Sequence, residues 1–94
     1  MTKVIMNFDE DGSIMFDCLN HAGDYDVCTI VSTLTNVLVE AVFDAGCEPT
    51  TYNPGHVRID LPAMHARKVK DTFRIVKKVF DRVQKQNPDN IKIY

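Results

Sequence analysis

Residues 27–45 read VCTIVSTLTNVLVEAVFDA and contain the longest uncharged run of the chain. Apolar side chains recur in it at intervals of three and four residues, which is the spacing of one face of an α-helix. These side chains are Val27, Ile30, Val31, Leu34, Val37, Leu38, Ala41, Val42 and Ala45. Asp24 or Asp26 can cap the first turn, and Gly46 is suited to end the last one. The pattern predicts a helix over residues 27–45 that is buried against a sheet.

Alternating apolar and polar residues on both sides of this helix predict strands. The predicted strands cover residues 3–8, 13–19, 48–52, 56–61 and 91–94. The turns 9–12 and 53–55 join two pairs of them, and a second helical pattern covers residues 63–86. The order ββαββαβ predicts an α+β fold with two helices on one face of a mostly antiparallel sheet. We expect residues 1–94 to form a single domain.

The composition is that of a folded globular protein, with 45% hydrophobic and 26% charged residues among 94. The chain contains no run of about 20 apolar residues suited to cross a membrane, and its N-terminus lacks a secretory signal pattern. Three cysteines are an odd number and too few for a disulfide scaffold, which favours a reduced, cytoplasmic setting. Because so small a domain buries a limited share of its surface, we expect a homodimer.

The net charge of −2 hides an uneven distribution along the chain. Nine of the 13 acidic residues lie in residues 1–48, and ten of the 11 basic residues lie in 49–94. Most of the bases fall on the second predicted helix, opposite its apolar stripe: Arg67, Lys68, Lys70, Arg74, Lys77, Lys78, Arg82 and Lys85. This face is either a contact surface for RNA or an acidic protein, or a solvated helix face. The second interpretation is favoured, because no aromatic side chain is interleaved for base stacking.

The segment NHAGDYDVC, residues 20–28, combines residues suited to nucleophilic chemistry. It places His21 after a strand and Cys28 in the first turn of a helix, where backbone N–H groups favour the reactive thiolate. His21 can accept the thiol proton or stand beside the thiolate as imidazolium. Asp24 or Asp26 can orient the imidazole, but their negative charge can also disfavour the thiolate. Cysteine is often a buried core residue as well, so spacing alone leaves a structural role open.

This segment resembles the ribosomal-processing cysteine protease family, Prp. Members of that family carry a histidine and an alanine at the end of the second strand, then a helix that opens with Val-Cys and continues with Val-Ser-x-Leu. The chain has His21-Ala22, Val27-Cys28 and Val31-Ser32-Thr33-Leu34 at these positions. The element order and the length also match, so the resemblance covers nearly the whole chain.

The chain departs from the family pattern at several positions. Asn20 replaces the glycine before the histidine, Asp26 replaces an isoleucine, and Thr29-Ile30 replace two alanines. The loop of residues 22–27 between His21 and Cys28 is shorter than in the family. These differences are typical of a divergent member, such as a phage-encoded or lineage-specific one.

The resemblance implies a cysteine endopeptidase that acts without a cofactor. Cys28 would be the nucleophile, His21 the general base and Ser32 an auxiliary polar group. Donors near the start of the helix, such as the N–H of Cys28, are expected to stabilise the oxyanion. An extended peptide would cross the helix N-terminus, where the remaining candidates lie: Gly23 and Tyr25 as substrate contacts, and Asp24 and Asp26 as auxiliary groups.

Members of the family trim the N-terminal extension of a large-subunit ribosomal protein, and phage relatives are expected to trim virion proteins. The resemblance therefore implies a protein substrate of one of these two kinds. The alternative is a catalytically inactive relative that binds a protein or RNA through its basic second helix.

The remaining cysteines and histidines favour plain structural roles. Cys18 shares a strand face with Phe16 and is expected in the core, and Cys47 follows the glycine that ends the helix. His56, beside a turn, and His65, near a helix start, are expected at the surface. We expect no metal site, because no C-x-x-C or H-x-x-x-H pair is present.

Overall fold

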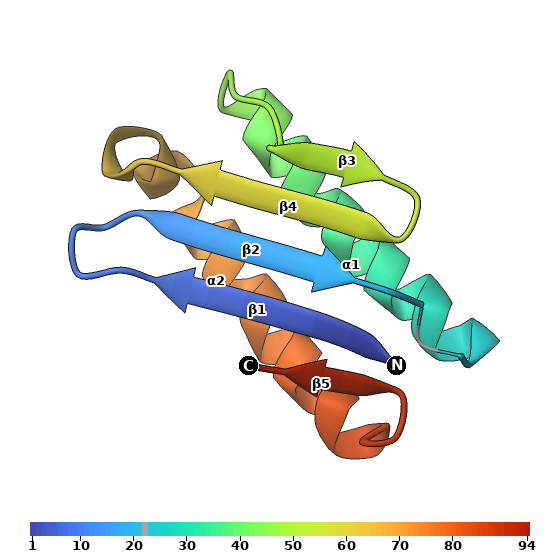
Figure 1. Ribbon diagram of the computed structural model, residues 1–94. Coiled ribbons are helices and arrows are strands. Elements are labelled where there is room, and N and C mark those ends of the chain that lie inside the picture. Colours follow the sequence, from blue (N-terminus) through green and yellow to red (C-terminus); the bar gives the residue numbers. More distant parts are fainter. Residues whose placement is uncertain (22) are drawn as a thin grey trace.

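The structure is a computed structural model and describes residues 1–21 and 23–94. In this part of the chain, five strands and two helices follow one another in the order ββαββαβ (Figure 1). Their bounds are Thr2–Phe8 (β1), Ile14–Leu19 (β2), Tyr25–Asp44 (α1), Thr51–Asn53 (β3), His56–Leu61 (β4), Ala63–Gln86 (α2) and Ile91–Ile93 (β5). The predicted α+β order is confirmed.

The five strands form one sheet in the order β3-β4-β2-β1-β5, so β3 and β5 are its edges. The pairs β1–β2, β2–β4 and β3–β4 are antiparallel, and β5 runs parallel to β1. Figure 1 shows both helices behind the same face of the sheet. The mostly antiparallel sheet with two helices on one face is confirmed.

The core fills the space between this sheet face and the two helices. Alternate residues of the strands point into it, as the period of two requires. Aromatic rings join the layers, since Phe16 of β2 lies 6.1 Å from Phe80 of α2, and Phe8 of β1 lies 4.7 Å from Phe73 of α2, between ring centroids. The largest fully buried side chains are Phe16, Phe73, Phe80, Ile91, Val4, Val39 and Val42.

Helix α1 begins two residues before the predicted start and buries a somewhat different face. Asp24 is the N-cap, and Gly46 follows the C-cap with a positive φ of 82°, as the predicted ending requires. Ile30 and Val37, predicted to be buried, are exposed, whereas Thr35 and Val39 are buried. The apolar stripe is wider than the contact area, and hydrophobicity alone does not say which part of it faces the core.

The short edge strand β3 differs most from the prediction. It covers Thr51–Asn53 rather than residues 48–52, and proline at position 49 has no N–H to contribute to a ladder. Asn53 pairs with His56, so the turn consists of Pro54 and Gly55 alone. Gly55 has φ 80°, which suits the third position of a type II turn after proline.

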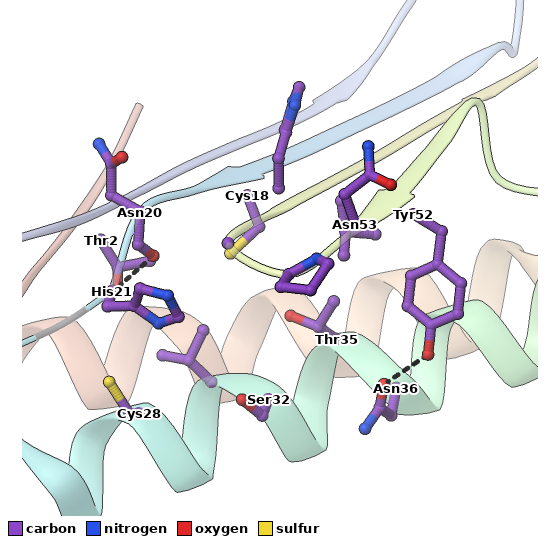
Figure 2. A pocket seen from close by; sticks show the side chains of 15 residues that line it. Thr2, Cys18, Asn20, His21, Cys28, Ser32, Thr35, Asn36, Tyr52 and Asn53 are labelled. Carbon is purple, nitrogen blue, oxygen red and sulfur yellow. Dashed lines mark hydrogen bonds between the residues drawn. The ribbon is translucent and has the colours of Figure 1, made fainter.

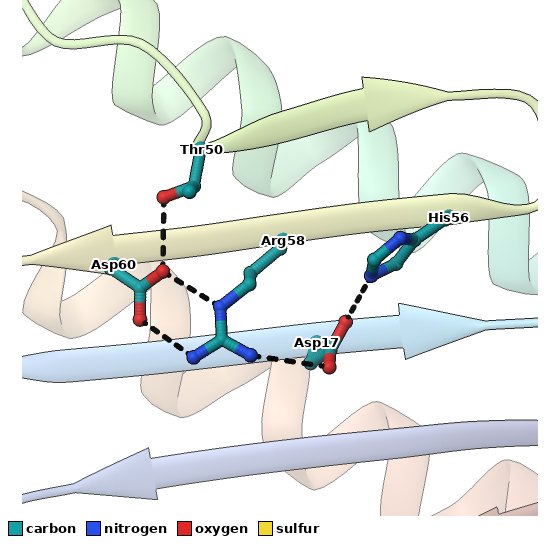
Figure 3. Close-up of polar contacts among 5 residues, drawn as sticks. All are labelled: Asp17, Thr50, His56, Arg58 and Asp60. Atoms are coloured by element: carbon teal, nitrogen blue, oxygen red, sulfur yellow. Dashed lines mark hydrogen bonds and ion pairs between the residues drawn. The ribbon is translucent and has the colours of Figure 1, made fainter.

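The sheet face opposite the helices carries a chain of polar contacts over β2 and β4 (Figure 3). His56 Nε2 lies 2.8 Å from Asp17 Oδ1. Arg58 donates to Asp17 over 3.5 Å and to Asp60 over 2.8 Å. The Arg58 guanidinium, together with a hydrogen bond from Thr50, lowers the pKa of Asp60. These groups satisfy one another across the strands and hold the two strands in register.

Contrary to the expectation from the sequence, helix α1 is long and apolar enough to cross a membrane by length and composition alone. Core helices of soluble proteins pass the same test. In this structure Val27, Val31, Leu38 and Val42 of α1 are buried within the domain.

Candidate active site

A pocket of about 200 Å³ opens where β2 ends, the β3–β4 turn begins and α1 passes beneath. His21, Cys28 and Ser32 all line it. Figure 2 shows the His21 ring entering from the chain after β2, while Cys28 and Ser32 rise from successive turns of α1. The structure therefore brings together three residues that the sequence singled out.

The chain just before His21 is fixed by two hydrogen bonds. The N–H of Asn20 donates to the carbonyl of Gly55 over 2.9 Å. The carbonyl of Asn20 accepts from the hydroxyl of buried Thr2 over 3.2 Å. His21 therefore starts from a backbone position that is tied both to β1 and to the β3–β4 turn.

Gly55 lies next to the imidazole ring of His21. A Cβ atom at this position would lie 3.5 Å from Nε2 of His21, which is ordinary van der Waals contact. The turn thus forms one wall beside the histidine. Sequence reasoning missed this wall, although the Asn-Pro-Gly turn was visible, because nothing local relates residue 55 to residue 21.

Cys28 is the fourth residue of α1 and is half-buried. Its backbone N–H donates to the carbonyl of Asp24 over 2.9 Å, which is the first hydrogen bond of the helix. The N–H of Val27 donates to the Asp24 carboxylate over 3.0 Å. The expected use of the Cys28 N–H as an oxyanion donor was therefore wrong, because that group is already engaged.

The residues predicted to flank the site on its N-terminal side lie outside the pocket. Gly23, Asp24, Tyr25 and Asp26 are exposed, and none of them is among the described residues that line it. The Asp24 carboxylate caps α1, so it does not orient the imidazole. Ala22, part of the segment that resembles Prp, lies outside the described residues.

The far side of the pocket consists of residues that sequence reasoning missed. Thr35 and Asn36 of α1 lie below, and Tyr52 of β3 and Pro54 of the turn lie above. Tyr52 Oη donates to Asn36 Oδ1 over 3.3 Å, which connects β3 to α1 (Figure 2). Helical periodicity places Asn36 two turns after Cys28 and could have suggested it. No comparable signal points to Tyr52.

Two of the side chains that line the pocket, Thr35 and Cys18, are buried. Thr35 is 5% exposed, and its hydroxyl makes no hydrogen bond to a described oxygen or nitrogen atom. Its polar neighbour is the thiol of Cys18, a weak hydrogen-bonding group. Burial raises the pKa of Cys18 to about 11, against a smaller opposing effect of Thr35. Cys18 is thus a core thiol, as expected.

The other candidate residues take the following positions. Cys47 is half-buried after the end of α1, His56 pairs with Asp17, and His65 is half-buried in the first turn of α2 rather than at the surface. Within residues 1–21 and 23–94, no group of three or more His, Cys, Asp or Glu side chains could hold a metal ion.

No family model matches the chain, and no curated protein matches it. A solved structure does: the crystal structure of an essential ribosomal processing protease Prp from S. aureus in complex with a covalently linked product peptide. The match has a TM-score of 0.81 at 18% sequence identity and covers 99% of this chain and 97% of that chain. The chain has the Prp fold.

The backbone conformation of Asn20 explains one departure of the sequence from the Prp motif. Where the family motif has glycine, Asn20 adopts a left-handed conformation with φ 74°. Glycine enters this region without steric cost, and asparagine is among the few other residues that tolerate it. Asparagine can therefore hold the backbone conformation from which His21 reaches the pocket.

Proposed function

We propose that the protein is a cysteine endopeptidase in which Cys28 is the nucleophile and His21 the general base. The observation that carries this proposal is that both side chains line one pocket on a Prp fold. A cysteine beside a base, at the edge of an open pocket, is the arrangement that nucleophilic catalysis requires.

The reaction follows from these two groups. His21 takes the thiol proton of Cys28, and the thiolate attacks the scissile carbonyl carbon to form a C–S bond. The C–N bond then breaks as the imidazolium returns the proton to the leaving amine, which leaves a thioester. Water, deprotonated by His21, hydrolyses the thioester and regenerates the thiol.

The oxyanion needs donors other than the engaged N–H groups of Val27 and Cys28. Ser32 lines the pocket one turn after Cys28, and its hydroxyl is the candidate donor. We assign Gly23, Asp24 and Asp26 to the surface outside the pocket, at the N-terminal end of α1, where a substrate would enter.

The proposed substrate is the N-terminal extension of a ribosomal protein or, for a phage-encoded enzyme, a structural protein of the virion. The structural neighbour is a ribosomal processing protease that holds a product peptide, which supports a protein substrate. We place the enzyme in the cytoplasm, since three cysteines without a disulfide suit a reducing compartment.

We also propose a homodimer, with an exposed apolar strip of α1 as its contact. Ile30 and Val37 are exposed on this helix, and Leu34 and Ala41 continue the same strip at helical spacing. Light scattering of Val37→Asp against wild type tests this. A wild-type dimer that becomes a monomer in the variant supports the strip, and a wild-type monomer contradicts the dimer.

Cleavage of a proteome-derived peptide library tests the proposed activity without knowledge of the substrate. We expect wild type to cut a narrow set of sequences, and Cys28→Ser and His21→Ala to cut none. Cys47→Ser is the matched control and should cut like wild type, because Cys47 lies outside the pocket. Equal cutting by Cys28→Ser would contradict the proposal.

The positive charge of α2 supports an alternative function, that of a binding module. Among residues 1–21 and 23–94, Asp71 and Asp81 pair with Arg74 and Lys77, and no ion pair involves the other six bases of the helix. If this face binds RNA, affinity must fall steeply with salt and disappear in a triple variant of Lys70, Arg74 and Lys77 to glutamine. Salt-independent or absent RNA binding contradicts that alternative.

A further inference from the structure

The pocket continues along α1 as a groove that leads away from Cys28. Ser32, Thr35 and Asn36 follow Cys28 on the same side of the helix, because they lie one and two turns further on. Tyr52 and Pro54 form the opposite side. Figure 2 shows Cys28 and His21 at one end of this groove and the Tyr52–Asn36 pair at the other.

The Tyr52–Asn36 hydrogen bond closes the far end of the groove. It spans 3.3 Å and joins the edge strand β3 to α1. Asn36 lies eight positions after Cys28 in the helix, which corresponds to about 12 Å along the axis. An extended peptide rises about 3.4 Å per residue, so the groove holds about three or four residues on one side of the scissile bond.

The described residues that line the groove include no aspartate, glutamate, lysine or arginine, and two histidines, His21 and His56, are among them. Its floor is made of buried or half-buried Cys18, Val31, Thr35 and Val57. The described lining offers no carboxylate, ammonium or guanidinium partner to a charged substrate side chain, so burying one there would be costly. A neutral stretch of chain fits it.

We propose that the acyl half of the substrate lies in this groove, with Tyr52 and Asn36 as the wall that ends it. This inference rests on the proposed function. The acyl half is the part that stays bonded to the cysteine as a thioester after the amine has left. A closed groove that starts at Cys28 keeps that half in place until water arrives. Tyr52 is then a specificity residue that contacts the substrate at its distal end.

Peptidyl chloromethyl ketones test the groove directly, because the Cys28 thiolate displaces chloride and forms an S–C bond that leaves the peptide on the acyl side. We would use acetylated reagents with one to five alanines and measure alkylation of Cys28 by mass spectrometry. The rate constant should rise with length up to about three or four residues and then stop rising. It should not depend on salt. A rate that is independent of length would overturn the proposal.

Tyr52→Ala removes the end wall. We expect the tetra-alanyl reagent to react about fivefold more slowly, as when one aromatic contact is lost, while iodoacetamide, which does not reach Tyr52, reacts unchanged. Tyr94→Ala is the matched control, since Tyr94 is 58% exposed against 55% for Tyr52 and lies at the opposite edge of the sheet. Equal loss in both variants, or no loss in Tyr52→Ala, would contradict the proposal.

A second measurement separates the groove from the chemistry. If iodoacetamide shows Cys28 no more reactive than Cys47, the proposed function fails, whatever the groove does. Acetyl-tetra-alanine amide is then titrated into Cys28→Ala and followed by NMR. Shifts of the Tyr52 and Asn36 amide signals support the groove, and unchanged signals overturn it.

Discussion

The backbone N–H of Asn20 donates a 2.9 Å hydrogen bond to the carbonyl of Gly55. Both residues have positive φ, 74° and 80°, so two left-handed positions far apart in the sequence meet beside the pocket. One precedes His21, and the other forms a wall beside its ring. The position of the proposed base thus depends on two backbone conformations that few side chains tolerate.

Substitution of Asn20 tests this dependence. Asn20→Gly should preserve stability, because glycine adopts the left-handed region without strain. Asn20→Val should lower the free energy of unfolding by about 1–2 kcal/mol and reduce the reactivity of Cys28. Urea unfolding and iodoacetamide labelling measure the two effects. Equal stability of the two variants would show that the conformation is not strained.

Gly55→Ala separates backbone strain from contact with His21. Gly46 has a similar φ of 82°, but a Cβ there would meet nothing within 4 Å, so Gly46→Ala is the matched control. Both variants should lose about 1 kcal/mol of stability from the strained backbone. Only Gly55→Ala should change the pH dependence of Cys28 labelling. The same change in Gly46→Ala would rule out a local effect on His21.

Thr35→Val should raise the free energy of unfolding by about 1 kcal/mol, because it removes a buried hydroxyl that lacks an oxygen or nitrogen partner. Thermal unfolding measures the change. Thr33→Val is the control on the same helix, since its exposed hydroxyl donates to the carbonyl of Thr29, and it should have little effect. A destabilised Thr35→Val would mean that the contact with the Cys18 thiol is stronger than we infer.

Stability should fall as the pH rises from about 9 to about 11 because of Cys18. Burial raises the pKa of this thiol from 9.0 to about 11, so in that range the folded state holds a proton that the unfolded state has lost. The cost reaches about 2 kcal/mol at the upper end. Cys18→Ala has no thiol to ionise, so its free energy of unfolding lacks this pH dependence. The difference in free energy of unfolding between wild type and Cys18→Ala should therefore shrink from about pH 9 to about pH 11. A constant difference in urea unfolding would contradict the assignment.

Much of the fold followed from local patterns. The hairpin, both helices and the ββαββαβ order were predictable because alternation and helical spacing reflect which side chains face the core. The buried face of α1 was harder to predict, because Ile30 and Val37 fit the apolar stripe but are exposed. The position of α2 beside α1 sets the buried face, and the sequence of α1 does not contain that information.

Only the part of the candidate site that lies within residues 21–32 could be predicted from the sequence. His21, Cys28 and Ser32 lie within residues 21–32, and the resemblance to the Prp family singled out all three. Tyr52 and Gly55 reach the pocket through the pairing of β3 with β4 and of β4 with β2. Contacts that depend on the order of strands in a sheet leave no local signal in the sequence. Tyr52 and Gly55 could therefore be placed at the site only from the structure.

The rate of iodoacetamide labelling at each cysteine from about pH 5 to about pH 9, in wild type and in His21→Ala, tests most directly whether Cys28 and His21 form a catalytic pair. If they do, Cys28 reacts fastest and at a lower pH than Cys47, and this advantage is lost in His21→Ala. Cys18 should react slowest because it is buried. If Cys28 reacts no faster than Cys47 and does not respond to His21→Ala, the two residues do not form a catalytic pair.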